Sequence, residues 1–261
     1  MQKKHIVLTA LVGLLAARLA AQPFALDLKT EIPLGSALLA GELFHNIYDF
    51  TAAEDDWDGT TFYDEKDVNA FDRALMHRYN KPLDRAGDVM VVLLPAGVVL
   101  LNSYAVYKNY GLNDLLTQTV IAAETLLMAH TLPAITKPLV LRVRPYNYYF
   151  GGEGMEDDWN RSFFSGHTTM AFAAATFGTY TYAKWFPDSS FKIPFAAISY
   201  GLAAFTGISR IYAGCHFTTD VLMGAAVGTA VGFLVPWLHT LSTKDTQIAL
   251  TPAGFSVTKH W

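Results

Sequence analysis

The second half of the chain carries three groups of polar residues that stand at the ends of apolar runs. In chain order they are Lys137 with Arg144, the tripeptide Ser165-Gly166-His167, and Arg210 with His216 and Asp220. Charged and imidazole groups are costly inside a bilayer, so their position at the ends of apolar segments is informative. Successive helices of an up-and-down bundle place these ends at the same side. We therefore expect the three groups to converge at one membrane surface.

Three of these residues are fixed cations, and their chemistry suits a phosphate group. Lys137, Arg144 and Arg210 have no acidic neighbour in the motifs except Asp220. A trio of cations fits a dianionic tetrahedral group, and the planar guanidinium of arginine matches two phosphate oxygens at once. The Ser165 hydroxyl and the Gly166 backbone N–H, at a helix N-terminus, can add further donors.

The remaining three residues can carry the covalent chemistry. His216 and Asp220 are four residues apart and share one face if the helix has begun by His216. A carboxylate bonded to one imidazole nitrogen fixes the tautomer and leaves the other nitrogen free as a nucleophile. His167, from a different segment, is then available to protonate the leaving oxygen. This set is complete for phosphoryl transfer without a metal ion or a cofactor.

The composition predicts where these residues operate. The chain has 261 residues and a formal charge of −4, with 52% apolar and 16% charged residues. Soluble domains carry about 25% charged residues, so this chain is expected to reside in a membrane. The acidic balance without a basic cluster argues against binding nucleic acid. A single cysteine, Cys215, excludes an internal disulfide and a multi-cysteine metal site.

The apolar runs predict an all-α bundle of about six helices. Five long runs cover residues 90–107, 115–140, 167–186, 191–208 and 221–238. The run 32–48 is interrupted by Glu42 and His45, which leaves open a short first helix or an interfacial one. Glycines at four-residue steps, Gly224, Gly228 and Gly232, are typical of close helix packing in lipid.

The chain divides into three parts. Residues 1–21 combine a basic start with a short apolar run, which is typical of a signal peptide to be cleaved or of a retained anchor. Residues 22–241 form the membrane domain, in which the pattern of residues 68–76 predicts a short amphipathic helix. Residues 242–261 form a polar C-terminal tail with β-forming residues and no assigned role.

The acidic segment 54–65 has some features of a calcium-binding loop. Residues 54–65 place acidic side chains and Gly59 at the spacing of a calcium-binding EF-hand loop. The first position is Glu54 where Asp is usual, and Thr61 stands where an apolar residue is usual. A solvated acidic loop is the interpretation we favour.

The three groups together resemble the signature of the type 2 phosphatidic acid phosphatase (PAP2) superfamily. The resemblance covers residues 137–220: Lys137-x6-Arg144-Pro145, Ser165-Gly166-His167, and Ser209-Arg210-x5-His216-x3-Asp220. It implies the helical core that lipid phosphatases share with bacterial acid phosphatases and vanadium haloperoxidases. It also implies that His216 becomes phosphorylated, that His167 protonates the leaving group and that Asp220 orients His216. The phosphate-binding residues implied are Lys137, Arg144, Ser165, Gly166 and Arg210. Phe164 replaces the proline that usually precedes this tripeptide.

The sequence therefore predicts an integral membrane phosphatase that hydrolyses a lipid phosphomonoester or pyrophosphate. The partners expected are the lipid substrate and the bilayer, and the oligomeric state is left open. The alternatives are a non-catalytic membrane scaffold or lipid-binding protein, and a lipid phosphotransferase. For a bacterial source, the site would face the periplasm if Lys3 and Lys4 stay inside, residues 22–87 lie outside and the segment 32–48 does not fully cross the membrane.

Overall fold

The computed structural model describes residues 22–51, 63–149, 159–240, 246–251 and 254–259. The predicted signal peptide or anchor at 1–21 lies outside these ranges. Most of the candidate calcium loop, residues 54–62, also lies outside them.

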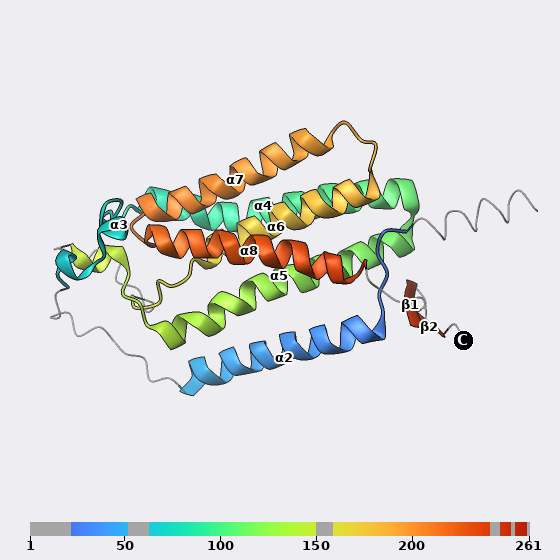
Figure 1. Ribbon diagram of the computed structural model, residues 1–261, viewed down its shortest axis with the longest axis horizontal. Helices are drawn as coiled ribbons and strands as arrows, with labels where there is room; N and C mark the ends of the chain where they lie inside the picture. The colour runs from blue at the N-terminus through green and yellow to red at the C-terminus, as the bar shows by residue number, and fades with distance from the viewer. Residues whose placement is uncertain (1–21, 52–62, 150–158, 241–245, 252–253, 260–261) are drawn as a thin grey trace, which may run out of the picture.

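The predicted all-α bundle of about six helices is confirmed. In the described part of the chain, six helices have 20 residues or more (Figure 1). They are α2 (Leu28–Thr51), α4 (Lys81–Tyr110), α5 (Leu112–Val140), α6 (Gly166–Trp185), α7 (Lys192–Tyr212) and α8 (Thr218–Leu238). Short pieces connect them: η1 (Glu65–Asp67), α3 (Ala70–Arg73) and η2 (Pro145–Tyr148). The one-turn helix α3 lies inside the range for which an amphipathic helix was predicted.

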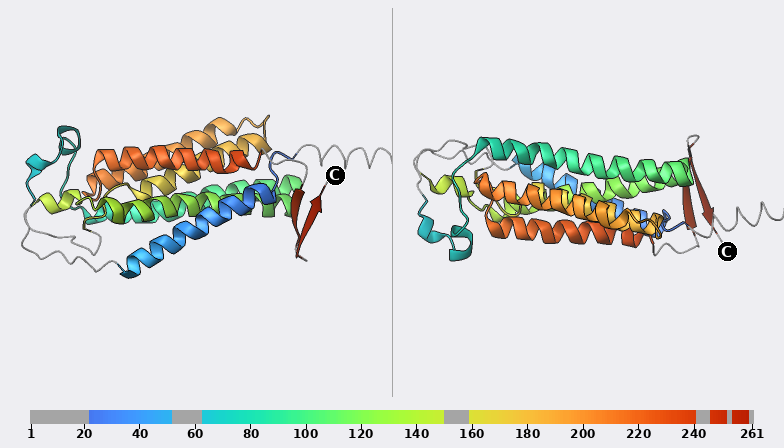
Figure 2. Two further views of the ribbon diagram at one scale, coloured as in Figure 1. Left: turned by 60° about the horizontal axis from the view of Figure 1, so that its bottom comes forward. Right: turned by 90° about the horizontal axis from the view of Figure 1, so that it is seen from above.

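The helix α2 is longer than the sequence indicated. It has 24 residues and runs along the bundle from one end to the other (Figures 1 and 2). Glu42, which interrupts the apolar run, accepts a hydrogen bond from Thr131 of α5 at 2.5 Å and lies 3.3 Å from His130. The polar residue that weakened the apolar pattern is thus a contact that holds α2 against α5.

The outer surface of the bundle is apolar, as a lipid environment requires. The helices α4, α5 and α8 are long and apolar enough to cross a membrane. Large apolar side chains on the outside stay exposed, for example Ile193 at 80% and Leu100 at 69%. Such a surface would be unstable in water, because monomeric soluble proteins rarely expose large continuous apolar patches. The chain is therefore an integral membrane protein.

The glycines of α8 allow this helix to approach α6 closely. A Cβ atom on Gly224, Gly228 or Gly232 would come within 2.7, 2.3 or 2.4 Å of a backbone carbonyl oxygen of the segment 165–173. A carbonyl oxygen cannot rotate aside as a side chain can, so only glycine fits. The predicted role of this series in helix packing is confirmed, and the packing fixes the N-terminal ends of α6 and α8 beside each other.

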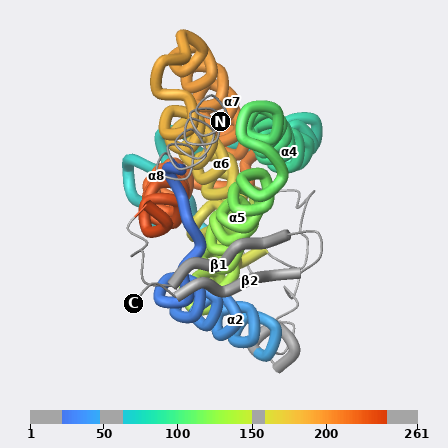
Figure 3. Tube along the Cα trace, turned by 90° about the vertical axis from the view of Figure 1, so that its right-hand side faces the viewer, coloured from blue at the N-terminus to red at the C-terminus, as the bar shows by residue number. Residues whose placement is uncertain are grey.

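Five helix ends meet at one end of the bundle, on the left in Figure 1. They are the N-termini of α4, α6 and α8 and the C-termini of α5 and α7, with α3 beside them. The start of α2 and the end of α8 lie at the opposite end, near a two-stranded hairpin (Figure 3). Its strands, β1 (Thr246–Thr251) and β2 (Gly254–Lys259), pair antiparallel with Thr246 opposite Lys259. The polar tail thus contains a β-hairpin.

Candidate active site

A cavity of about 170 Å³ opens at the end of the bundle where the five helix ends meet. Its lining residues are Tyr79, Asp84, Asp88, Lys137, Arg144, Tyr146, His167, Arg210, Cys215 and His216. Five of the eight predicted site residues are in this set, contributed by all three polar groups of the sequence. The structure therefore brings together three cations and two imidazoles that lie up to 79 positions apart in the chain.

The first group is positioned by the sharp end of α5. Lys137 lies in the last turn of this helix, which ends at Leu141 in the left-handed conformation with φ at 51°. The chain then turns back, and the Arg144 backbone N–H donates to the Trp159 carbonyl at 2.8 Å. The Arg144 guanidinium is buried, and its Nη1 donates to the Cys215 carbonyl at 3.1 Å. Arg144 is thus tied to the loop that precedes α8.

The same guanidinium sets the protonation of His216. Arg144 Nη1 lies 3.5 Å from His216 Nε2, and because an arginine can only donate, Nε2 is the nitrogen without a proton. Burial lowers the pKa of the His216 imidazole well below 6.5, and the charges of Arg144, Lys137 and Arg210 lower it further. The ring is therefore neutral near pH 7, with the Nε2 lone pair available as a nucleophile.

Asp220 lies next to His216 and accepts several hydrogen bonds. The helix α8 begins at Thr218, two residues after His216, so the two residues are not on one helix face as the sequence allowed. Asp220 Oδ2 still lies 3.6 Å from His216 Nδ1, and it accepts from the Ser162 hydroxyl at 2.5 Å and the Phe217 N–H at 2.9 Å. Its contact with His216 is electrostatic, since 3.6 Å is too long for a hydrogen bond.

Arg142 connects Asp220 to the short helix α3, a link that sequence analysis missed. Its guanidinium donates to Asp220 and, at 2.8 Å, to Asp72. Asp72 also accepts from the Thr219 N–H at 2.9 Å. Burial would raise the pKa of Asp72, but the hydrogen bonds from Thr219, Asn69 and Arg142 hold it below its ordinary value.

Two aspartates of α4 complete the cavity and were also missed. Asp84 Oδ1 lies 2.7 Å from Arg210 Nη1, and Asp88 Oδ1 lies 2.9 Å from His167 Nε2. The signal in the sequence was their four-residue spacing at the start of an apolar run, which places both carboxylates on one face of a helix. Nothing local indicated that this face meets Arg210 and His167.

The last two predicted residues lie beside the cavity without lining it. Ser165 is the N-cap of α6, where its buried hydroxyl accepts from the Thr168 hydroxyl at 2.9 Å and from the Thr168 N–H at 3.4 Å. Gly166 lines a second cavity of about 330 Å³, which shares Lys137 and His167 with the first. The two cavities are therefore neighbours.

Cys215 contributes to the wall of the first cavity. Its thiol donates to Asp84 Oδ1 at 3.2 Å. Burial raises the pKa of this thiol to about 12. The group is therefore a protonated packing residue at neutral pH, and it does not supply a thiolate.

A helical membrane bundle with cations and imidazoles around one cavity defines a class of membrane protein with an anion-binding site. Residues 118–244, just under half of the chain, match the sequence profile of the PAP2 superfamily.

One curated protein and two solved structures are similar to this chain. A stretch of 109 residues, 42% of this chain, is 40% identical to the lipid A 1-phosphatase of Porphyromonas gingivalis. The stretch spans 22% of that protein, so the chain matches about a fifth of its relative's length. The crystal structure of a transmembrane PAP2-type phosphatidylglycerolphosphate phosphatase from Bacillus subtilis has the same fold. Its TM-score is 0.51 at 20% identity, over 82% of this chain and 98% of that one. The Aquifex aeolicus LpxE structure gives a TM-score of 0.35 at 24% identity, over 60% and 86% of the two chains.

Proposed function

We propose that this protein is a membrane phosphatase that hydrolyses a lipid phosphomonoester or pyrophosphate through a phosphohistidine at His216. The observation that carries the proposal is the cavity in which Lys137, Arg144 and Arg210 stand around the two imidazoles. The PAP2 family match and the lipid A 1-phosphatase relative support this chemistry. Ser165 and Gly166 are proposed to add donors to the phosphate when substrate is bound.

In the proposed first step, the neutral Nε2 of His216 attacks the phosphorus atom. A phosphorus–nitrogen bond forms and the bond to the leaving oxygen breaks. Charge on the three equatorial oxygens is stabilised by Lys137, Arg144 and Arg210, which are already fixed in place. Asp220 stabilises the positive charge that His216 acquires.

His167 is proposed to handle the proton. Asp88 Oδ1 lies 2.9 Å from His167 Nε2 and is proposed to orient this ring, which in its protonated form gives its proton to the leaving oxygen. In the second step the neutral His167 takes a proton from a water molecule as the water oxygen attacks phosphorus. The phosphorus–nitrogen bond to His216 breaks, and inorganic phosphate is released. This step restores both histidines, and it needs no metal ion.

The second cavity supports a lipid as the substrate. Apolar residues on three helices line it, among them Val91 on α4, Pro133 and Ala134 on α5, and Met170 on α6. It shares Lys137 and His167 with the polar cavity. A lipid tail can occupy this space while its phosphate lies in the polar cavity.

The test is release of inorganic phosphate from a long-chain lipid phosphate by the protein purified in detergent. We expect turnover in wild type, inhibition by vanadate, and resistance to EDTA at temperatures well below unfolding. His216→Ala should abolish turnover in a protein that remains monodisperse. Retained turnover in His216→Ala would refute the nucleophile. No release by wild type across a panel of lipid phosphates would favour a scaffold, and transfer of phosphate to a second lipid would favour a phosphotransferase.

We further propose that the site faces the periplasm of a bacterial cell. The long helix α2 changes the expected orientation, because the start of α2 and the candidate active site lie at opposite ends of the bundle (Figure 1). If Lys3 and Lys4 lie in the cytoplasm, the site faces the periplasm only when residues 1–21 do not cross the membrane. A translocated N-terminus would reverse the orientation. Alkaline phosphatase fusions after Lys108 and Trp261 should both be inactive, and active fusions at both positions would reverse the assignment.

A further inference from the structure

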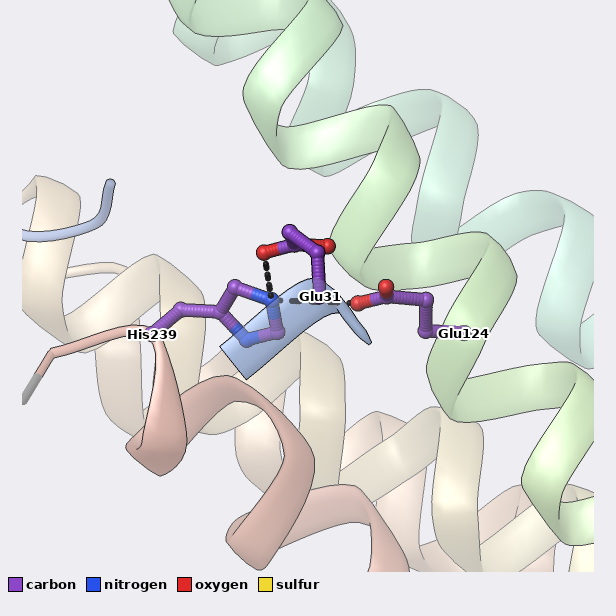
Figure 4. A group of neighbouring side chains, drawn as sticks. All are labelled: Glu31, Glu124 and His239. Carbon is purple, nitrogen blue, oxygen red and sulfur yellow. Dashed lines mark ion pairs between the residues drawn. The ribbon is translucent and has the colours of Figure 1, made fainter. Parts of the chain in front are cut away.

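A second cluster of ionisable side chains lies far from the candidate active site. Glu31 of α2, Glu124 of α5 and His239, which follows α8, point toward one another (Figure 4). Glu124 is 13 residues from Lys137 along α5, which corresponds to about 20 Å of helix rise. The cluster therefore cannot take part in the chemistry proposed above.

The three side chains have the geometry of a metal site. His239 Nε2 lies 3.1 Å from Glu31 Oε1 and 3.1 Å from Glu124 Oε2. All three atoms lie within 4.8 Å of one another. A tetrahedral ion with bonds of about 2.0–2.1 Å keeps its ligand atoms about 3.3 Å apart. The two separations from His239 Nε2 match this spacing closely.

The imidazole is oriented as a metal ligand requires. His239 Nδ1 lies 2.8 Å from the Val235 carbonyl, which can only accept, so Nδ1 carries a proton. In the neutral ring Nε2 then holds a lone pair directed toward the two carboxylates. A bond from the second nitrogen to a carbonyl is the usual support of a metal-bound histidine.

The three ligand atoms are buried and, in the described part of the chain, lack hydrogen bonds. The His239 side chain is 0% exposed, and the side chains of Glu31 and Glu124 are 17% and 13% exposed. Within the described residues, none of the three ligand atoms has a hydrogen bond of acceptable geometry, and the contacts of His239 Nε2 with the two carboxylates are ion pairs. Buried polar groups in native proteins are nearly always satisfied, so three such atoms facing one point call for a ligand between them.

Charge specifies the ligand. Two carboxylates and a neutral imidazole carry a charge of −2, which a divalent cation cancels in a region of low dielectric constant. Calcium and magnesium prefer oxygen ligands alone, whereas zinc accepts one nitrogen with carboxylate oxygens in a tetrahedral site. We propose that Glu31, Glu124 and His239 bind a zinc ion, with a water molecule as the fourth ligand.

The position of the ion gives it a structural role. The cluster joins the first turn of α2 to α5 and to the end of α8, and the His239 carbonyl accepts from the Ala25 N–H at 3.1 Å. A zinc ion there fastens the outermost helix to the bundle at the end opposite the phosphate cavity.

The test counts metal in the purified protein after removal of any histidine tag. The protein is stripped with EDTA, incubated with excess zinc chloride and desalted, and zinc per chain is measured by mass spectrometry. We expect one zinc ion per chain in wild type. Loss of a hydrogen bond that supports a metal ligand lowers metal affinity roughly 10- to 100-fold. His239→Ala removes a ligand itself, so it should lower the affinity for zinc by more than this. The matched control is His130→Ala, because His130 also lies beside a glutamate, Glu42, at 3.3 Å.

Two results would overturn the proposal. One is a wild type that retains no zinc, and the other is His239→Ala or Glu124→Gln retaining as much zinc as wild type and His130→Ala. Glu124→Gln preserves the side-chain shape and serves if His239→Ala does not fold. Zinc should also raise the unfolding temperature of wild type and of His130→Ala, and should leave that of Glu124→Gln unchanged.

Discussion

The close approach of α6 and α8 makes Gly228 a sensitive position outside the active site. In Gly228→Ala, the new Cβ would stand 2.3 Å from the Thr169 carbonyl oxygen. Ordinary contact begins at 3.4 Å, so the two helices must separate by at least 1.1 Å at this level. Thr169 is two residues from His167, and the other helix carries Asp220, so the separation shifts the two halves of the site relative to each other.

The expected consequence is a large loss of turnover with a modest loss of stability. A displacement of about 1 Å in a preorganised site can cost about 100-fold in rate. Overpacking costs about 1–3 kcal/mol, and the higher helix propensity of alanine returns about 1 kcal/mol of this. We therefore predict that kcat for lipid phosphate hydrolysis falls about 100-fold while the protein remains folded.

The assay is steady-state phosphate release together with thermal unfolding in detergent. Gly201→Ala on α7 is the matched control, because nothing lies within 4 Å of a Cβ at that position. It carries the same change in helix propensity and should keep the wild-type kcat. If folded Gly228→Ala turned over at the wild-type rate, the spacing of α6 and α8 would not control the geometry of the site.

Three further predictions concern single side chains. Arg210→Ala should lower kcat by about 10²- to 10³-fold, as loss of a fixed charge donor does elsewhere, and steady-state kinetics will show a smaller effect if Arg210 only supports the fold. The Cys215 thiol, whose pKa is about 12, should resist iodoacetamide at neutral pH in the native protein and react after unfolding; equal labelling of both states would contradict its burial. Asp72→Asn should cost about 1–3 kcal/mol of unfolding free energy. Because the folded pKa of Asp72 is lowered, its contribution is present at neutral pH and lost as the pH falls through that value. Wild type and Asp72→Asn should therefore converge in stability in acid, and a constant difference would contradict this account.

The proposed zinc site and the contacts of α2 could not be predicted from the sequence. Nothing in the sequence pairs Glu124 with Glu31 or His239, because the three residues are separated by 93 positions or more. Glu42 lowered the apolar character of α2, and its partner Thr131 is 89 positions away. Polar groups that pair across a bundle are far apart in the sequence. Their pairing therefore produces no local pattern from which it could be predicted.

The sequence by itself determined the helical membrane class, the five long apolar runs and the residue types of the phosphate site. These follow from composition, from the 3.6-residue period and from motifs whose spacing is local. Only the tertiary structure decided that Asp84 and Asp88 face Arg210 and His167, that Arg142 links Asp220 to Asp72, and that α2 runs the length of the bundle. The physical reason is that these contacts depend on how the helices rotate about their axes and pack. That rotation is set by the whole bundle, including the close contact between α6 and α8.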